Sequence, residues 1–297
     1  VEFGTGDKAV KIGGENVFPL YSFDAAIENA PKVGIEITDF GMEHEPECIK
    51  KYYEGCATLA DMARKAASME GVDFLSFRME GGDPNGANKS TEELIGELKE
   101  IADAVDLPLV VCGCKNVEKD AELFSKAAEA LNGKNAVILS AKEENYKTVG
   151  AAAGLAYKQI VGAESAVDIN LAKQLNVLIS QLGVDSKSVV MNVGSAAVGY
   201  GFEYVISTMD RVKAAALQQG DANLQMPIIT PVASEAWGVK EAMASETDAP
   251  EWGSQEERGI DMEVETAMAV IAAGSNAVIL KHPESIKIIS GLMKELV

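Results

Sequence analysis

The sequence predicts a single (β/α)8 TIM barrel of the α/β class. Eight short runs rich in Val and Ile recur along the 297 residues. Each run has the length of a strand that is buried on both faces of a parallel sheet. Amphipathic segments separate the runs at a spacing of roughly 30 residues, which is close to one strand–helix–strand unit.

The eight strand candidates follow one another in order. They are residues 33–38, 74–79, 108–112, 136–140, 158–161, 189–193, 227–230 and 277–281, of which 158–161 is the weakest. A doubly wound open sheet is the main alternative, and it usually carries a Gly-rich phosphate loop after its first strand. Residues 39–43, Asp-Phe-Gly-Met-Glu, are not such a loop, so the barrel is favoured.

The segments between the strands have helical periodicity. In residues 91–102, Leu94, Leu98 and Ile101 fall on one stripe, and Ser90 is a suitable N-cap before two glutamates. Further helices are expected over residues 116–131, 168–182, 205–217 and 283–296.

Two segments lie outside the eight units. Residues 8–23 predict a β-hairpin with strands at 9–12 and 17–21, which would close the N-terminal end of the barrel, so about residues 1–25 form an extension. Residues 235–261 form a long insertion after strand seven, and such connections usually serve the functional face. The length alone allows two domains, but no linker poor in apolar residues is present, so residues 1–297 are expected to be one domain.

Composition excludes several classes of function. The chain is 47% hydrophobic, with 26 Lys and Arg against 46 Asp and Glu, giving a net charge of −20. Such a surface repels phosphate, so nucleic-acid and anionic-membrane partners are not expected. No run approaches the ~18 apolar residues of a membrane span, and the N-terminus does not resemble a signal peptide. A cytoplasmic protein is expected.

A barrel places its chemistry at the C-terminal ends of its strands. That rule selects residues 38–40, 79–85, 112–115, 140–142, 164–165, 192–196, 230–234 and 281–282. Several of these stretches contain Gly, Ala or Ser, which allow a bulky flat ligand or another protein to approach the backbone. Tight turns also require Gly, so both interpretations stay open.

Four acids fall in or near these stretches. Asp39, Glu80, Asp83 and Glu164 could act as general bases or bind a pterin. Nothing in the sequence pairs them, and helix capping or solvation in a loop explains most of them.

The four cysteines, Cys48, Cys56, Cys112 and Cys114, do not form a disulfide framework. Cys112 and Cys114 are expected on one side of a strand, but two thiolates do not complete a zinc site. An iron–sulfur cluster needs four suitably spaced ligands. Structural thiols are therefore expected.

The two histidines, His44 and His282, give little support for Ser-His-Asp or zinc-hydrolase chemistry, and no Asp-x-His-x-x-Gly motif offers a histidine to cobalt. An aldolase-type barrel with a Schiff base on Lys142 or Lys281 is a further alternative, because a desolvated lysine becomes nucleophilic.

A family resemblance adds to this interpretation. It rests on residues 24–31, 74–85, 192–204, 209–218, 224–242, 251–259 and 280–285, which span nearly the whole chain. The most distinctive run is Gly-Tyr-Gly-Phe-Glu-Tyr at 199–204. Together these segments resemble the small subunit of the corrinoid iron–sulfur protein, whose archaeal counterpart is the delta subunit of acetyl-CoA decarbonylase/synthase.

The resemblance implies a barrel that pairs with a large subunit in a heterodimer. In that family the large subunit carries the [4Fe–4S] cluster and a corrinoid-binding domain. The heterodimer carries a methyl group from a methyltetrahydrofolate:corrinoid methyltransferase to acetyl-CoA synthase in the reductive acetyl-CoA (Wood–Ljungdahl) pathway. It also implies that this chain is a non-catalytic carrier subunit without an iron–sulfur cluster of its own.

The barrel mouth is then expected to enclose one face of the corrinoid (a cobamide), because reduced cobalt must be shielded from water and oxidants. The peripheral amides of a corrin need backbone and hydroxyl partners. From barrel geometry, the expected contacts are Gly113, Asn192, Gly194, Ser195, Thr230 and Ser234.

The alternative is an enzyme that binds a reduced pterin and transfers the methyl group to the corrinoid itself. It requires acids and an amide that converge on the pterin, for which Asp39, Asp83 and Asn192 are the candidates. Binding of methyltetrahydrofolate to the isolated chain would distinguish the two.

Overall fold

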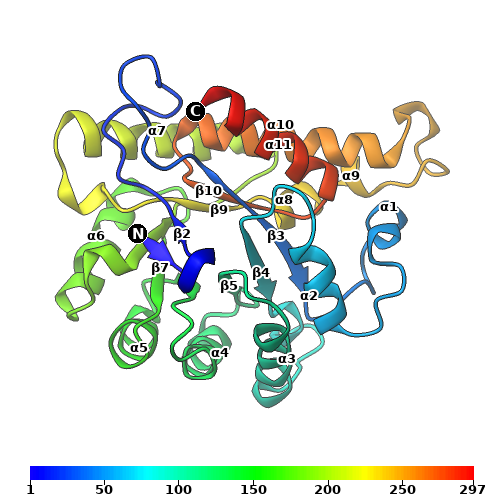
Figure 1. Ribbon diagram of the computed structural model, residues 1–297, viewed down its shortest axis with the longest axis horizontal. Helices are drawn as coiled ribbons and strands as arrows, with labels where there is room; N and C mark the ends of the chain where they lie inside the picture. Colours follow the sequence, from blue (N-terminus) through cyan, green and yellow to red (C-terminus); the bar gives the residue numbers. More distant parts are fainter.

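Eight parallel strands form the barrel in the computed structural model, which describes residues 1–297 (Figure 1). In chain order the strands are β3 Lys32–Thr38, β4 Phe74–Arg78, β5 Leu109–Cys112, β6 Val137–Ala141, β7 Ile160–Glu164, β8 Val189–Asn192, β9 Ile229–Pro231 and β10 Ala277–Leu280. They pair in the order β8-β7-β6-β5-β4-β3-β10-β9. A parallel bridge between Met191 and Ile228 joins β8 to β9 and closes the circle. The predicted fold class is confirmed.

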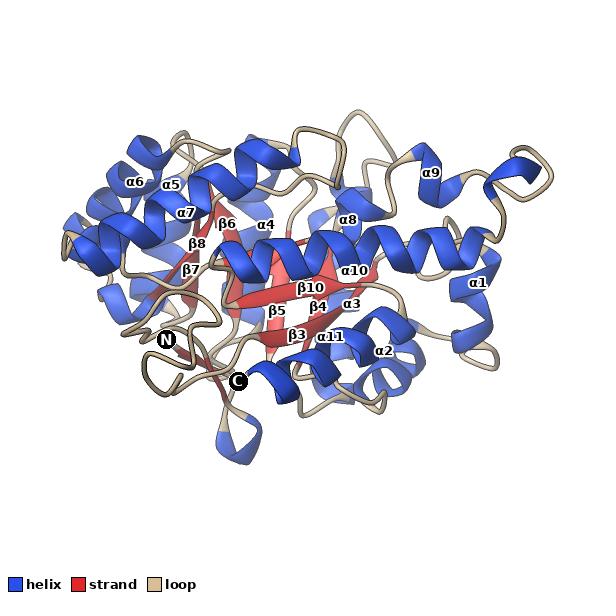
Figure 2. Ribbon diagram, turned by 90° about the horizontal axis from the view of Figure 1, so that it is seen from above, coloured by secondary structure: helices blue, strands red, loops and turns tan.

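Helices surround the barrel (Figure 2), and they alternate with its strands along the chain. They are α1 Glu47–Lys50, α2 Leu59–Ala67, α3 Thr91–Ala104, α4 Val117–Ala130, α5 Tyr146–Val149, α6 Ile169–Gln181, α7 Phe202–Gln218, α8 Ala233–Ala236, α9 Lys240–Met243, α10 Gln255–Ala273 and α11 Pro283–Leu296. Ser90, Asn116 and Asp168 accept backbone N–H groups at the starts of α3, α4 and α6, as their residue types predict. None of the helices combines the length and apolar character that a membrane crossing requires.

Two hydrophobic clusters divide the core. The larger one lies between the sheet and the helices. The smaller one fills the barrel interior with residues that alternate along each strand, such as Phe74 on β4, Val137 on β6 and Ile279 on β10. This is the alternation expected when every second residue of a barrel strand points inward. The helix-facing residues explain why the strands appear as continuous apolar runs in the sequence.

The N-terminal hairpin exists, and the expected strand at residues 9–12 is confirmed, but its partner is not the expected one. β1 (Glu2–Phe3) pairs with β2 (Val10–Lys11) in antiparallel register, whereas residues 17–21 form no strand. The expected turn at Gly13-Gly14 adopts positive φ at both residues, and Gly13 packs against Pro227, so the chain leaves the hairpin there. Phe3, Val10 and Ile12 join the interior cluster. The expected closure of the N-terminal end is confirmed.

The insertion after β9 is shorter than the predicted 235–261. Helix α10 already begins at Gln255, because Ser254 caps it and two glutamates occupy its first turn. The insertion therefore holds α8, α9 and a 3-10 helix at Pro250–Trp252. The Arg258 guanidinium binds the carbonyl oxygens of residues 241, 244 and 253, and Trp252 packs over it. One arginine thus fixes the course of this loop.

Contacts of Trp237 and Glu263 anchor the base of the insertion to the barrel. The Trp237 ring lies against Gly259 of α10, where any Cβ atom would overlap it. Glu263 of the same helix is fully buried and accepts the backbone N–H groups of Lys281 (2.6 Å) and His282 (3.1 Å). The insertion, α10 and the end of β10 therefore form one packed unit.

Candidate functional site

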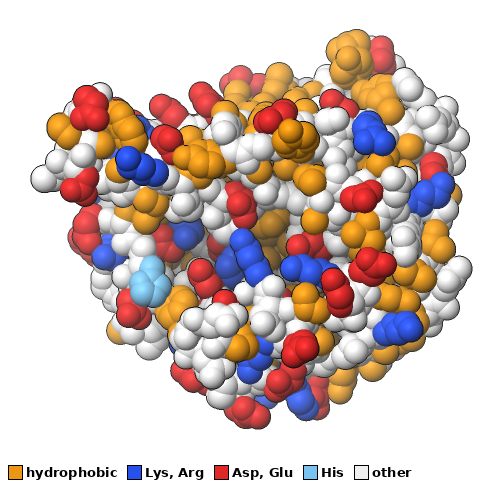
Figure 3. Space-filling view, turned by 180° about the vertical axis from the view of Figure 1, so that it is seen from behind, with side chains coloured by type: hydrophobic (Ala, Val, Ile, Leu, Met, Phe, Trp, Pro, Cys, Tyr) orange, Lys and Arg blue, Asp and Glu red, His pale blue; other side chains and the backbone are white.

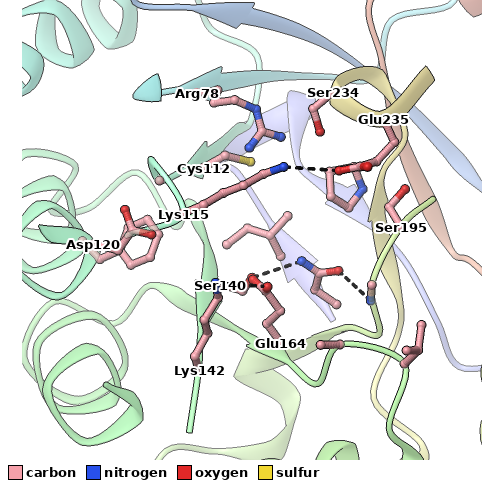
Figure 4. A pocket seen from close by; sticks show the side chains of 18 residues that line it. Arg78, Cys112, Lys115, Asp120, Ser140, Lys142, Glu164, Ser195, Ser234 and Glu235 are labelled. Carbon is pink, nitrogen blue, oxygen red and sulfur yellow. Dashed lines mark hydrogen bonds and ion pairs between the residues drawn. The ribbon is translucent and has the colours of Figure 1, made fainter. Parts of the chain in front are cut away.

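The C-terminal mouth of the barrel is hollowed into a polar cavity of about 320 Å³. Figure 3 shows this face, with lysines and acidic side chains around the hollow, and Figure 4 shows the lining. The lining comprises Arg78, Cys112, Gly113, Lys115, Asp120, Phe124, Leu139, Ser140, Lys142, Glu164, Ala166, Val167, Asn192, Gly194, Ser195, Pro231, Ser234 and Glu235. Strands β4 to β9 all contribute to it. This is the end of a barrel at which function is expected.

A chain of hydrogen bonds crosses one wall of the cavity (Figure 4). Asn192 at the end of β8 donates from Nδ2 to Ser140 Oγ (3.1 Å), and Ser140 Oγ donates to Glu164 Oε2 (2.8 Å). Asn192 Oδ1 accepts the N–H of Gly194 (3.1 Å), and Lys142 Nζ lies 3.4 Å from Glu164 Oε1. Three neighbouring strands thus place an amide, a hydroxyl and an ion pair side by side.

Arg78 forms part of the opposite wall. Its guanidinium contacts Glu36 Oε2 of β3 through Nε (2.9 Å) and Nη2 (2.8 Å), and both side chains are buried. Burial lowers the pKa of Arg78, but the Glu36 carboxylate more than offsets this effect, and the net shift is upward. The guanidinium therefore remains charged, and it points into the cavity (Figure 4).

The turn after β5 shapes a third part of the wall. Asp120 of α4 accepts the backbone N–H of Cys114 (2.7 Å), and a Cβ atom on Gly113 would overlap this carboxylate. Burial raises the pKa of Asp120. Lys115 has φ +71° and reaches across the mouth to Glu235 of α8, with 3.3 Å between Nζ and Oε1.

The two cysteines near this turn do not share a side of the strand, contrary to the expectation. Cys112 faces the barrel interior, with its Sγ 3.6 Å from Ser76 Oγ. β5 ends there, and Cys114 packs with the helix-side core, where its Sγ lies 3.3 Å from Asp120. Burial raises the pKa of both thiols, in Cys114 to about 12. Neither is poised to act as a thiolate.

Five of the six residues expected at the corrinoid line the cavity: Gly113, Asn192, Gly194, Ser195 and Ser234. Thr230 does not. It follows the inward-facing Ile229, so the alternation of the strand turns its side chain toward the helices. There it is fully buried, and its hydroxyl lies 2.7 Å from Ser275 Oγ.

The three candidates for a pterin site do not converge. Asp39 is buried outside the cavity, where its carboxylate accepts the N–H of Gly81 (2.9 Å) and pairs with Lys89 (3.0 Å). Asp83 accepts the N–H of Asn85 in an exposed loop. Only Asn192 lines the cavity. The two acids therefore shape the loop after β4; Asp83 is a solvated loop residue as expected, whereas Asp39 is a buried partner of Lys89.

Neither lysine considered for Schiff-base chemistry is a free amine. Lys142 is paired with Glu164. Lys281 is buried against Glu45, with 2.7 Å between Nζ and Oε1. Burial lowers the pKa of Lys281, but Glu45 and Glu36 outweigh this effect and raise it overall. An amine held in its charged form is not a nucleophile.

Sequence reasoning did not single out Arg78 or Glu235 as site residues, although both line the cavity. A sequence signal exists for Arg78, because it is the one charged residue of a mostly apolar strand and stands at its end. Glu235 lies at the start of the insertion, and its distance from Lys115 in the sequence hides their contact.

The chain is similar in sequence to a known protein family. The family model for the CO dehydrogenase/acetyl-CoA synthase delta subunit matches residues 1–293. Among similar sequences, the acetyl-CoA decarbonylase/synthase complex subunit delta of Methanothermobacter thermautotrophicus is 32% identical over 292 residues, covering 97% of this chain and 73% of that protein. The subunit delta of Methanopyrus kandleri is 32% identical over 293 residues, with 98% and 71% covered.

Solved structures with a similar fold include two dihydropteroate synthases. The enzyme of Xanthomonas albilineans, in complex with 7,8-dihydropteroate, has a TM-score of 0.59 at 11% identity and covers 100% of this chain and 98% of its own. The enzyme of Thermus thermophilus, in complex with 4-aminobenzoate, has a TM-score of 0.59 at 13% identity, with 100% of both chains covered. At this identity the likeness concerns the barrel alone.

Proposed function

The chain belongs to the CO dehydrogenase/acetyl-CoA synthase delta subunit family, and from this we propose that it is the small subunit of a heterodimeric corrinoid iron–sulfur protein. Its partner is a large subunit that holds the corrinoid and the iron–sulfur cluster. The heterodimer carries a methyl group from a methyltetrahydrofolate:corrinoid methyltransferase to acetyl-CoA synthase in the reductive acetyl-CoA pathway. This chain is a non-catalytic subunit of that carrier, and the mouth of its barrel covers one face of the corrinoid.

One observation supports this role above others: the connections after β7, β8 and β9, on the same side of the barrel as the polar cavity, carry exposed apolar side chains. They are Val167, Tyr200, Tyr204, Met243 and Trp252, of which Val167 also lines the cavity. Tyr200 donates to Glu241 Oε2 (2.6 Å) and so links the loop after β8 to the insertion. A polar cavity on a side of the barrel that also exposes apolar side chains suits a flat ligand that is presented by another chain.

The lining fits the periphery of a corrinoid. Ser195 Oγ is buried and has no hydrogen-bond partner within the chain, and Asn192 and Ser234 add an amide and a hydroxyl. We propose Gly113, Asn192, Gly194, Ser195 and Ser234 as the contacts; Thr230 is withdrawn because its side chain is buried behind β9. When bound, the cobalt supplies the chemistry of accepting and releasing the methyl group. The residues of this chain position the ring and keep water away.

The chain does not fit an iron–sulfur cluster. Cys112 and Cys114 face different cores, and Cys48 and Cys56 lie in the segment around α1. The cluster therefore belongs to the partner in this proposal.

Reconstitution with the large subunit tests the proposal. The isolated chain should be colourless, and the co-purified complex should carry corrinoid and iron–sulfur absorption. Ser195→Arg should block the mouth and weaken retention of the corrinoid. Ser186→Arg, at the opposite end of β8 and exposed, is the matched control and should have no effect.

Three outcomes would overturn the proposal. The first is that the isolated chain retains the corrinoid, and the second is that it fails to bind any large subunit. The third is that the isolated chain binds methyltetrahydrofolate and transfers its methyl group to free corrinoid, as a pterin-dependent methyltransferase would.

A further inference from the structure

We propose that the mouth cavity is a recognition site for a neutral primary carboxamide arm of the corrinoid, while the ring itself lies above the mouth. This inference rests on the proposed function and deepens it. It assigns to the cavity a chemical class of group, and it predicts that the site rejects the corresponding carboxylate.

Cavity size is the first argument. About 320 Å³ is at the lower end of the range for sites that enclose a small organic ligand, which is about 300–1,000 Å³. A corrin macrocycle with all its substituents exceeds this volume. A short arm that ends in a carboxamide fits into it easily. The ring must therefore remain above the cavity, with its arms directed into it.

Charge balance is the second argument. Each basic group that lines the cavity has an acidic partner: Lys142 with Glu164 (3.4 Å), Lys115 with Glu235 (3.3 Å) and Arg78 with Glu36 (2.8 Å). Asp120 has no basic partner, and its carboxylate accepts the backbone N–H of Cys114 (2.7 Å). The lining therefore offers no free cation to an anionic ligand, so the cavity favours a neutral one.

Hydrogen-bonding capacity is the third argument. A primary carboxamide donates two N–H bonds and accepts at its oxygen. Ser195 Oγ is buried and unpartnered, so it can donate or accept. The Arg78 guanidinium points into the cavity as a donor, and the Glu164 carboxylate has capacity to accept beyond its bond from Ser140 (Figure 4). Donors and acceptors thus line the same small space, as an amide requires.

The same lining disfavours a carboxylate. Asp120, Glu164 and Glu235 all border the cavity, and a further carboxylate there would have no free cation to pair with. It would also lose the two N–H donors. Removing the charge of Glu164 frees the Lys142 ammonium, which would then attract a carboxylate.

The test uses the complex of this chain with its large subunit. Cobinamide is compared with its three monocarboxylate isomers, in each of which one propionamide arm has been hydrolysed. One isomer should bind at least about tenfold more weakly than cobinamide to the wild-type complex. In Glu164→Gln that same isomer should regain affinity or bind more tightly than cobinamide. Glu129→Gln breaks an exposed pair with Lys126 on α4 and should leave the ranking unchanged.

The outcomes separate this inference from the proposed function. If corrinoid retention needs this chain but all isomers bind alike, or if Glu164→Gln leaves the ranking unchanged, the carboxamide site is wrong and the carrier role stands. If the large subunit retains the corrinoid equally well without this chain, the carrier role itself fails, and the inference fails with it.

Discussion

The Trp237 indole stacks on the His282 imidazole, with ring centroids 5.8 Å apart and planes 14° from parallel. The tryptophan comes from the insertion after β9, and the histidine comes from the end of β10. Tyr52 packs edge-on against the same imidazole, with centroids 5.2 Å apart. One histidine therefore holds together two segments that border the barrel mouth.

Gly259→Ala should destabilise the fold, because an added Cβ would overlap the Trp237 ring. Overpacking of this kind costs about 1–3 kcal/mol, which urea unfolding would measure. Gly291→Ala on α11 is the matched control. Nothing lies within 4 Å of its Cβ position, so it should be neutral or slightly stabilising. Equal loss in both variants would contradict the packing argument.

The free energy of unfolding should decrease as the pH is lowered, because of His282. Burial lowers its pKa from 6.5 to about 4, although Glu256 opposes this shift. The unfolded chain then takes up a proton between these values before the folded chain does. The contribution of His282 to the free energy of unfolding is fully present above pH 6.5. It declines by up to roughly 3 kcal/mol as the pH falls toward 4, and below pH 4 this group causes no further loss.

His282→Asn is the comparison for this pH dependence. Asparagine can still accept the Glu284 N–H at the start of α11, as His282 Nδ1 does (3.2 Å), but it does not titrate. Its unfolding free energy should fall less steeply between pH 6.5 and 4. Identical slopes in urea titrations of both proteins would show that His282 is not the responsible group.

Glu45→Gln should be strongly destabilising, because it leaves the buried Lys281 ammonium without its 2.7 Å partner. Breaking a buried pair on one side costs about 3–5 kcal/mol. Removing both charges, in Glu45→Gln with Lys281→Met, should recover most of that loss. Thermal and urea unfolding of the two single variants and the double variant measure the coupling. A double variant as unstable as the sum of the singles would exclude it.

Arg258→Lys should loosen the insertion without unfolding the barrel. A lysine cannot bind the three carbonyl oxygens that the guanidinium holds. Hydrogen exchange should rise over residues 237–254, and affinity for the large subunit should fall. Arg211→Lys on the exposed face of α7 is the control and should change neither. Unchanged exchange over the insertion would refute the role given to Arg258.

Hydropathy periodicity was sufficient to predict the barrel, because buried parallel strands and amphipathic helices leave strong local patterns. The hairpin and the insertion were placed less accurately. The partner of β2 is β1 rather than residues 17–21, because the backbone at Gly13 and Gly14 follows from packing on Pro227, which is distant in the sequence. The end of the insertion was misplaced because residues 255–261 are rich in charged side chains, although they form the first two turns of α10.

The rule that strand ends carry the site located the cavity, but it could not tell inward from outward side chains in short strands. Thr230 and Asn192 are both polar residues near strand ends, yet only Asn192 points inward. The pairing of Lys115 with Glu235 spans 120 positions, and no local pattern reveals such a contact. Which residues share a wall is thus a property of the closed sheet rather than of any one segment.

Phe3, Val10 and Ile12 fill the N-terminal end of the barrel. A group that enters the mouth cavity must therefore leave through the opening by which it came. If a partner chain covers that opening, the exchange of anything beneath it can proceed no faster than the partner lifts. Because the other end of the barrel is closed, the rate of release from the cavity then depends on how fast the subunit interface opens. One group must leave through the mouth before the next can enter.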